Sequence, residues 1–176
     1  MAESGRGWPM ADFRAELTTW LDEHHDELAP SYPPPGTLDQ QIEQMQRVKA
    51  RLFDAGWMRH GWPERVGGLG GSPMLRTELG ATLAARDLID PGLFSLIEVL
   101  APTLIDFAPP ALAAEVVPRL LSGTEMWCQG FSEPGTGSDL GSLQCRATAR
   151  GDADKPSAWV INGQKVWTSL AQYSDR

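Results

Sequence analysis

The feature that most constrains the fold is a change in the spacing of apolar residues near Gly123. Upstream of this glycine, apolar side chains recur every three to four residues, which is the spacing of an amphipathic helix. Downstream, apolar and β-branched residues come in short alternating runs that are typical of strands. The sequence therefore predicts a helical domain followed by β structure, an α+β fold.

Helices account for most of the first 123 residues. The pairs Ser72-Pro73 and Asp90-Pro91 each combine an N-cap residue with a proline suited to the first helical turn. Pro30, Gly56 and Pro118 mark expected helix ends. The expected helices cover 10–29 (Phe13, Leu17, Trp20 and Leu21 on one face), 38–55 (Leu38, Ile42, Met45 and Leu52 inward), a stretch through Leu75, Leu79 and Leu83, a stretch from Asp90 through Leu100, and 111–117.

Short strands are expected in the last part of the chain. Asn162-Gly163 is a strong hairpin signal, because a type I′ turn needs positive φ at both central residues. The expected strands are 126–132, 143–149, 159–161 and 165–169. These are too few to close a β domain, and they leave an open sheet edge. We therefore interpret 1–123 as an N-terminal helical domain and 124–176 as the incomplete start of a β-barrel-like domain, in the front part of something larger or in one half of an assembly.

Charge and cysteine content exclude several functions. Fifteen basic and 23 acidic residues give a net charge of -8, which disfavours nucleic acid as a partner because no basic patch offsets it. Cys128 and Cys145 form no metal-ligand pattern, so neither a zinc site nor a disulfide framework is expected. A cytoplasmic location is the simpler interpretation. No secretory signal is recognised, and no apolar stretch is long enough to span a membrane.

Common enzyme motifs are absent or misplaced. The glycine cluster 67–71 follows no strand and lacks dinucleotide-binding spacing, so a tight bend between helices is the better interpretation. No phosphate-binding P-loop occurs. The three histidines, His24, His25 and His60, favour solvated or packing roles over a metal site or a hydrolase triad.

The most informative stretch is 130–142, in which glycines and hydroxyl side chains follow an expected strand. Such a loop offers backbone N–H and hydroxyl groups to the oxygens of a phosphate or of a polarised carbonyl. Some thirty residues further on, Trp167 provides a flat ring beside Thr168 and Ser169. With seven tryptophans in the chain, a place in the core remains an alternative for this one.

Together these segments resemble the acyl-CoA dehydrogenase family. One family motif stands as Ser132-Glu133-Pro134-Gly135-Thr136-Gly137-Ser138-Asp139, and a second as Ile161-Asn162-Gly163-Gln164-Lys165-Val166-Trp167-Thr168-Ser169. Weaker similarity extends upstream to 62–68 and 121–124. The chain departs from the family at Phe131 and Thr136, where smaller residues are more usual, and at Leu170, where Asn is common.

The resemblance implies an FAD site and an acyl-CoA substrate. In this family a carboxylate removes the α-proton of the thioester while the β-hydrogen passes to the flavin as hydride, which yields the trans-2-enoyl-CoA. The family's C-terminal helical bundle, which carries that carboxylate, has no counterpart in these residues, so no catalytic residue is assigned and Glu133 is expected to support the loop. The residues implied in flavin binding are Gln129, Gly130, Phe131, Ser132, Gly137, Ser138, Trp167, Thr168 and Ser169, with Ser138 also near the acyl-CoA.

The resemblance further implies an electron-transfer protein as acceptor and a dimeric or tetrameric assembly. The 176 residues alone are expected neither to hold FAD tightly nor to oxidise acyl-CoA. Two alternatives stay open. One is a non-catalytic partner subunit or fragment of a hetero-oligomer, and the other is an oxygen-using relative such as an acyl-CoA oxidase or a flavin monooxygenase.

Overall fold

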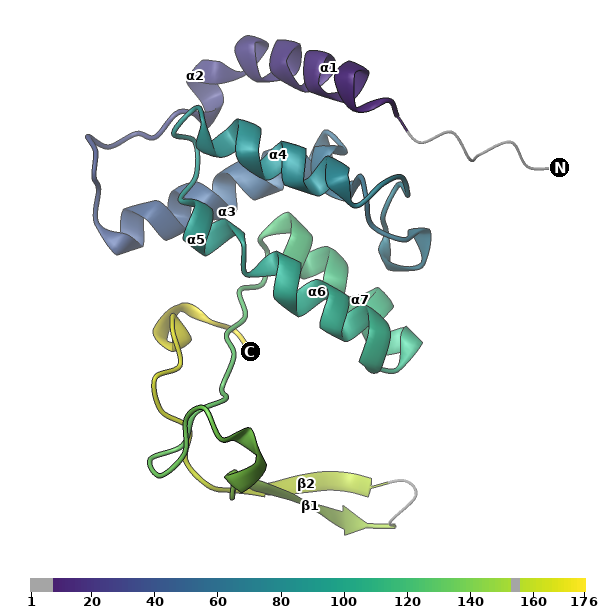
Figure 1. Cartoon of the computed structure of the whole chain (residues 1–176), viewed down its shortest axis with the longest axis vertical. Helices are drawn as coiled ribbons and strands as arrows, with labels where there is room; N and C mark the ends of the chain where they lie inside the picture. Colours follow the sequence, from purple (N-terminus) through teal and green to yellow (C-terminus); the bar gives the residue numbers. More distant parts are fainter. Residues whose placement is uncertain (1–7, 153–155) are drawn as a thin grey trace, which may run out of the picture. The chain divides into compact units, whose positions relative to one another are not determined.

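The computed structural model describes residues 8–152 and 156–176, and it divides the chain into two compact units between Glu125 and Met126 (Figure 1). The first unit is helical and the second holds a two-stranded antiparallel sheet. The predicted α+β class, with a helical region followed by the first strands of a β domain, is confirmed. The assignment of 1–123 and 124–176 as domains of a larger protein stays a prediction.

The first unit is built from α-helices joined by turns and loops. Its longest helix, α3, begins after Thr37, whose side chain accepts from the Gln40 N–H while the Gln40 side chain accepts from the Thr37 N–H. This reciprocal capping box explains why the helix starts directly after the proline-rich loop. The helices are α1 (Met10–Glu23), α2 (His25–Leu28), α3 (Leu38–Asp54), α4 (Met74–Ala84), α5 (Pro91–Phe94), α6 (Ile97–Phe107) and α7 (Pro110–Ser122), with 3₁₀ turns at Trp57–Arg59 and Glu64–Val66.

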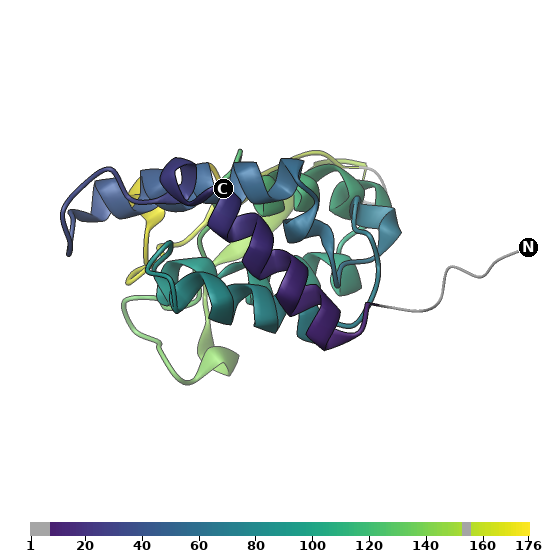
Figure 2. The same ribbon diagram turned by 90° about the horizontal axis from the view of Figure 1, so that it is seen from above.

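The helices share one apolar core. α1 packs against α4, and α7 packs against both α3 and α6 (Figures 1 and 2). α1, α3 and α4 each bury side chains at the spacing of one helix face. The predicted residues that are buried are Phe13, Leu17 and Leu21 in α1, Ile42, Met45 and Leu52 in α3, and Leu75, Leu79 and Leu83 in α4. Val48 of α3 is buried with them, whereas Trp20, expected on the same face of α1, is only partly buried.

Several helix ends differ from the prediction, including the end expected at Pro118. α7 continues through Pro118 to Ser122, because Val116, Val117, Leu120 and Leu121 are all buried and their packing outweighs one lost backbone hydrogen bond. The helix expected from Asp90 through Leu100 is two helices, and the second runs through Pro102 to Phe107. The helix expected over 10–29 breaks at His24. Leu38, expected inward, lies in the first turn of α3 and is 40% exposed.

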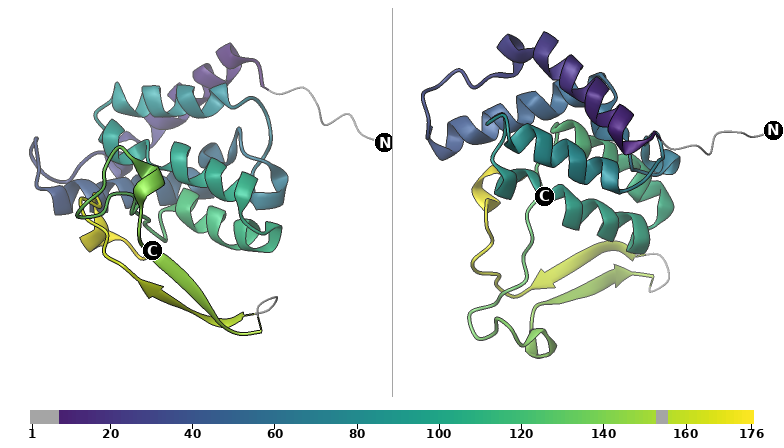
Figure 3. Two further views of the ribbon diagram at one scale, coloured as in Figure 1. Left: turned by 60° about the horizontal axis from the view of Figure 1, so that its bottom comes forward. Right: turned by 45° about the horizontal axis from the view of Figure 1, so that its top comes forward.

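In the second unit, β1 (Arg146–Gly151) pairs with β2 (Pro156–Asn162), and the two strands lie side by side in both views of Figure 3. The predicted hairpin turn at Asn162-Gly163 is wrong, because Asn162 is the last residue of β2 and pairs with Arg146. Gly163 instead lies against Cys145: a Cβ on Gly163 would be 2.7 Å from the Cys145 Cα. The strand expected over 143–149 begins only at Arg146.

The strands expected over 126–132 and 165–169 are also wrong: both segments are irregular. Their backbone groups bond to loops and to the C-terminal segment instead of to a ladder. The Cys128 N–H donates to the Arg176 carbonyl, and the Asp175 N–H donates to the Met126 carbonyl. In the part of the chain that the structure describes, no helix is both long and apolar enough to cross a membrane.

Candidate functional site

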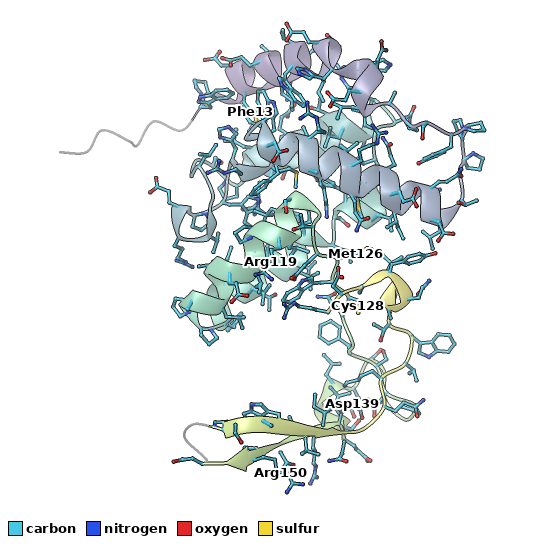
Figure 4. The ribbon with its side chains drawn as sticks, turned by 180° about the vertical axis from the view of Figure 1, so that it is seen from behind. Phe13, Arg119, Met126, Cys128, Asp139 and Arg150 are labelled. Atoms are coloured by element: carbon cyan, nitrogen blue, oxygen red, sulfur yellow. The ribbon has the colours of Figure 1, made fainter. Side chains whose placement is uncertain are left out.

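The second unit brings the two motif segments together. We call residues 130–142 the hydroxyl loop and residues 165–170 the tryptophan segment (Figure 4 labels Asp139 in the loop and Cys128 just before it). The loop starts with a tight turn in which Glu133 and Thr136 exchange backbone hydrogen bonds of 2.8 and 3.0 Å. The Thr136 and Ser142 hydroxyls lie 3.1 Å apart, and Ser142 Oγ donates to the Asp139 carbonyl. The loop is therefore closed by its own hydrogen bonds.

A single carboxylate joins three parts of this unit. Glu133 is 8% exposed, and its two oxygens accept from the Gln144 N–H at 2.7 Å, from the Cys145 N–H at 2.9 Å and from Lys165 Nζ at 2.9 Å. These donors, with the Lys165 ammonium first among them, lower the pKa of Glu133 to about 2. The side chain is thus ionised at every pH at which the protein is expected to work.

Lys165 also holds the tryptophan segment against the hydroxyl loop. Its Nζ donates to the Phe131 carbonyl at 3.0 Å as well as to Glu133, and the neighbouring Val166 N–H donates to the Ser132 carbonyl at 2.9 Å. Gly130 lies close by, since a Cβ there would be 3.3 Å from the Lys165 Cγ and 3.8 Å from the Thr168 Oγ1. The two segments are therefore in direct contact.

Trp167 projects into solvent from a strained position. Its side chain is 91% exposed, and its backbone has φ of +57°, which is uncommon for a bulky residue. Leu170, three residues later, also has positive φ, at +64°. Trp167 therefore does not fill a core among the described residues of this unit, and its predicted contact with a flavin stays a prediction. Strain of this kind clusters at functional sites.

Several hydroxyl side chains of the hydroxyl loop and the tryptophan segment are available to a ligand. Among the described residues, none of the side chains of Ser132, Ser138, Thr168 and Ser169 makes a hydrogen bond. Phe131 is 55% exposed, whereas Gln129 is only partly exposed. Gly137 and Ser138 lie further along the loop, beyond the turn at Glu133 and Thr136, and both are exposed. The predicted binding residues thus combine one open aromatic ring with available donors, although their roles stay predictions.

Lys165 is the residue of this site that sequence reasoning missed. Lys165 is one residue of the second family motif, yet its ammonium makes two of the three polar links between the segments. The sequence does contain a signal for this contact, because one motif carries a cation, Lys165, and the other carries a carboxylate, Glu133. Glu133, expected to support the loop, does so through its contacts with Gln144, Cys145 and Lys165.

Histidines and glycines of the helical unit have packing contacts. His24 stacks on Trp20 with ring centroids 4.2 Å apart, and His60 stacks on Trp8 at 5.2 Å. Burial, assisted by the Arg59 charge, lowers the pKa of His60. The bend at 67–71 is closed by a hydrogen bond from the Gly61 N–H to the Gly70 carbonyl. Within residues 8–152 and 156–176, no group of three potential metal ligands is found.

Comparison with known sequences points to one family. The family description "Acyl-CoA dehydrogenase, middle domain" matches residues 128–176, which include both segments of the site. The chain is 41% identical to "Acyl-CoA dehydrogenase IpdE1" of Mycobacterium tuberculosis over 93% of this chain and 42% of that protein. It is 37% identical to the protein of the same name in Mycolicibacterium smegmatis, over 93% of this chain and 44% of that protein. The chain thus spans less than half the length of these curated relatives.

Solved structures agree with the sequence matches. The structure named "Tcur3481-Tcur3483 steroid ACAD" aligns with a TM-score of 0.68 and 29% identity, over 99% of this chain and 43% of that chain. The "ChsE4-ChsE5 complex from Mycobacterium tuberculosis" aligns with a TM-score of 0.63 and 30% identity, over 97% of this chain and 41% of that chain.

Proposed function

The chain belongs to the acyl-CoA dehydrogenase family, and from that membership we propose that the intact protein containing it is an FAD-dependent acyl-CoA dehydrogenase. It would convert an acyl-CoA thioester to the trans-2-enoyl-CoA, and this chain would supply the N-terminal helical domain and the start of the middle β domain. The observation that carries the proposal is the exposed indole of Trp167 on a segment bound directly to the hydroxyl loop.

The residues present fit a flavin. A broad ring system needs a flat apolar surface, which the 91% exposed Trp167 offers, and hydrogen-bond donors at its polar edge. Ser132, Thr168 and Ser169 can supply such donors, and Gly130 leaves the backbone accessible. Gly137 and Ser138 suit the FAD pyrophosphate, because small residues expose the backbone N–H groups that bind phosphate oxygens. Gln129 and Phe131 complete the proposed lining.

Bound FAD would accept the hydride from the substrate β-carbon. The chain's own residues would bind and orient: Trp167 covers the ring, while Ser132 and Ser169 donate hydrogen bonds to its edge and stabilise charge that develops there. Ser138 would also reach the acyl-CoA. Glu133 is unsuited to be the base that removes the α-proton, because a base needs a pKa near the working pH and that of Glu133 is about 2.

Substrate, partners and location are parts of the same proposal. Two of the solved relatives are named "steroid ACAD", which supports a polycyclic acyl-CoA as the first substrate to assay. Another solved relative is a complex, ChsE4-ChsE5, which supports an oligomeric assembly with either identical or different partners. An electron-transfer protein as acceptor is proposed from the family resemblance, and a cytoplasmic location from the cysteine content, which favours a reducing compartment. Oxygen consumption without that acceptor would instead indicate the oxidase alternative.

The test compares Trp167→Ala with Ser138→Ala in the intact protein, with FAD affinity measured from the visible absorption of bound flavin. Removing the ring loses on the order of 100 Å² or more of stacked surface, worth several kcal/mol at the upper limit at ~25 cal/mol per Å². Removing the hydroxyl costs about 0.5–1.5 kcal/mol for a neutral hydrogen bond, and up to ~3 kcal/mol if its partner is a pyrophosphate. We expect the larger loss of affinity for Trp167→Ala.

Because Trp167 is 91% exposed, its substitution should leave folding intact, which circular dichroism of the flavin-free protein checks. A folded Trp167→Ala protein that holds FAD as tightly as the wild type would refute the stacking role.

A further inference from the structure

We propose that Glu133 and Lys165 form a positioning clamp that sets the separation between Ser132 and Trp167, and so holds the two halves of the flavin site in register. The inference rests on the proposed function for its ligand, but the clamp itself is defined by contacts within the second unit. Neither residue is proposed to touch FAD or substrate.

The hydroxyl loop and the tryptophan segment are joined through side chains and a single backbone hydrogen bond. Ser132 and Trp167 lie on different segments, and no strand pairing joins those segments in the described part of the chain. Three contacts do so: Lys165 Nζ to the Glu133 carboxylate at 2.9 Å, Lys165 Nζ to the Phe131 carbonyl at 3.0 Å, and the Val166 N–H to the Ser132 carbonyl at 2.9 Å. Two of the three depend on the one ammonium group.

The Glu133 carboxylate is held in place by the backbone as well as by Lys165. Glu133 accepts from the backbone N–H groups of Gln144 and Cys145, which lead directly into β1. The ammonium of Lys165 is thereby tied to the strand through Glu133. The position of the Lys165 ammonium is restricted because Nζ donates to two acceptors at once, the Phe131 carbonyl and a carboxylate that two backbone N–H groups already hold.

The backbone at Trp167 is strained and needs support from its neighbours. Trp167 stands two residues after Lys165 and has φ of +57°, a conformation that a tryptophan keeps only when its surroundings enforce it. Lys165 and Val166 hold the N-terminal side of this residue. On the other side, the Ala171 N–H donates to the Thr168 carbonyl and the Tyr173 N–H to the Leu170 carbonyl. Hydrogen bonds on both sides of Trp167 therefore fix the short strained segment that carries the indole.

The experiment uses the intact protein with Lys165→Met, Glu133→Gln, the double variant, and Lys165→Arg as the conservative replacement. Glu115→Gln, which removes the exposed Glu115–Arg119 pair on α7, is the matched control. Two quantities are measured: the FAD dissociation constant together with the visible band of bound flavin, and hydrogen exchange of the flavin-free protein over 130–145 and 163–170.

We expect Lys165→Met and Glu133→Gln each to weaken FAD binding about tenfold or more and to shift the flavin band. The double variant should be little worse than the more damaging single one, because both substitutions break the same unit. Lys165→Arg should recover most of the affinity, and Glu115→Gln should change nothing. In flavin-free protein, exchange at Val166, Gln144 and Cys145 should accelerate in Lys165→Met.

The clamp is overturned if exchange at these amides stays at the wild-type rate in Lys165→Met, or if the two single effects on FAD affinity simply add. Failure of the proposed function has a different signature: the wild-type protein would bind no FAD, and the exchange measurement alone would then decide whether the clamp exists. Accelerated exchange with unchanged FAD affinity and an unchanged flavin band would overturn its positioning role.

Discussion

Different kinds of interaction stabilise the interior of each of the two units. In the helical unit, apolar side chains from α1, α3, α4, α6 and α7 form a continuous buried core. In the second unit, Met126 is the one buried apolar side chain among the described residues, and the buried group at the centre of the loops is the Glu133 carboxylate. Large apolar side chains of the second unit are instead exposed: Phe131, Leu140, Trp159, Ile161 and Trp167.

This difference has a physical consequence for function. Apolar contacts are non-directional, whereas hydrogen bonds to one carboxylate favour a defined direction for each group that donates to it. The second unit therefore holds its loops in a defined geometry without covering them. Trp159 and Ile161 lie opposite Ala149 and Ala147, so one face of the hairpin is apolar and open.

Removing a buried aromatic side chain from the core of the helical unit should have the greatest effect on stability. Phe13 is fully buried, and Phe13→Ala should lower the free energy of unfolding of the helical unit by about 3–5 kcal/mol through lost burial and a cavity. Denaturant unfolding followed by circular dichroism at the helical band measures it. The matched control is Phe107→Ala at a residue that is 84% exposed, which should change stability by less than about 0.5 kcal/mol. Equal losses from both variants would contradict a core centred on Phe13.

Lys49 is a charged exception in the helical unit, and it gives the next largest effect. It is 5% exposed, and no described residue pairs with it; burial lowers its pKa from 10.5 to about 8. The unfolded chain binds the proton more tightly, so the free energy of unfolding should rise as pH increases from about 8 to 10.5. The full rise is on the order of 3 kcal/mol.

Lys49→Met keeps the length of the side chain and removes the charge. We expect this variant to be more stable than the wild type at pH 7 and to lose that advantage by about pH 10.5, as unfolding titrations at both values would measure. If the wild-type and variant curves ran parallel across this range, Lys49 would have an unperturbed pKa and its isolation in the core would be wrong.

How far the sequence predicts the molecule also differs between the units. Helical periodicity predicts α1, α3 and α4 and their buried faces, because apolar residues that recur every three to four positions lie on one face of a helix. The helix end expected at Pro118 was wrong, because the tertiary packing of α7 outweighs local propensity there, and α6 likewise continues through Pro102. In the second unit the motif residues were recognised, but three of the expected strands or turns around them were wrong. Hydrogen bonds to a side chain such as Glu133 leave no periodic signal in the sequence.

The smallest expected effect sharpens the account of the second unit. Leu170 occupies the left-handed region, with φ of +64° and ψ of 14°, where a leucine costs roughly 1–2 kcal/mol and asparagine is better tolerated. Asn is also the residue that the family commonly has at this position. We expect Leu170→Asn to stabilise the segment by about 0.5–1 kcal/mol, which would slow hydrogen exchange over 165–174 by roughly two- to fivefold.

Ala171→Asn is the matched control for that substitution. Ala171 is exposed and lies in the adjoining 3₁₀ turn with an ordinary negative φ, so asparagine there relieves no strain and should not slow exchange. If both variants slowed exchange equally, the gain would come from the polar side chain and not from backbone conformation. If Leu170→Asn accelerated exchange, the packing of the partly buried leucine would outweigh the strain of its backbone. The segment that carries Trp167 would then depend on apolar contacts of Leu170 as well as on the positioning clamp.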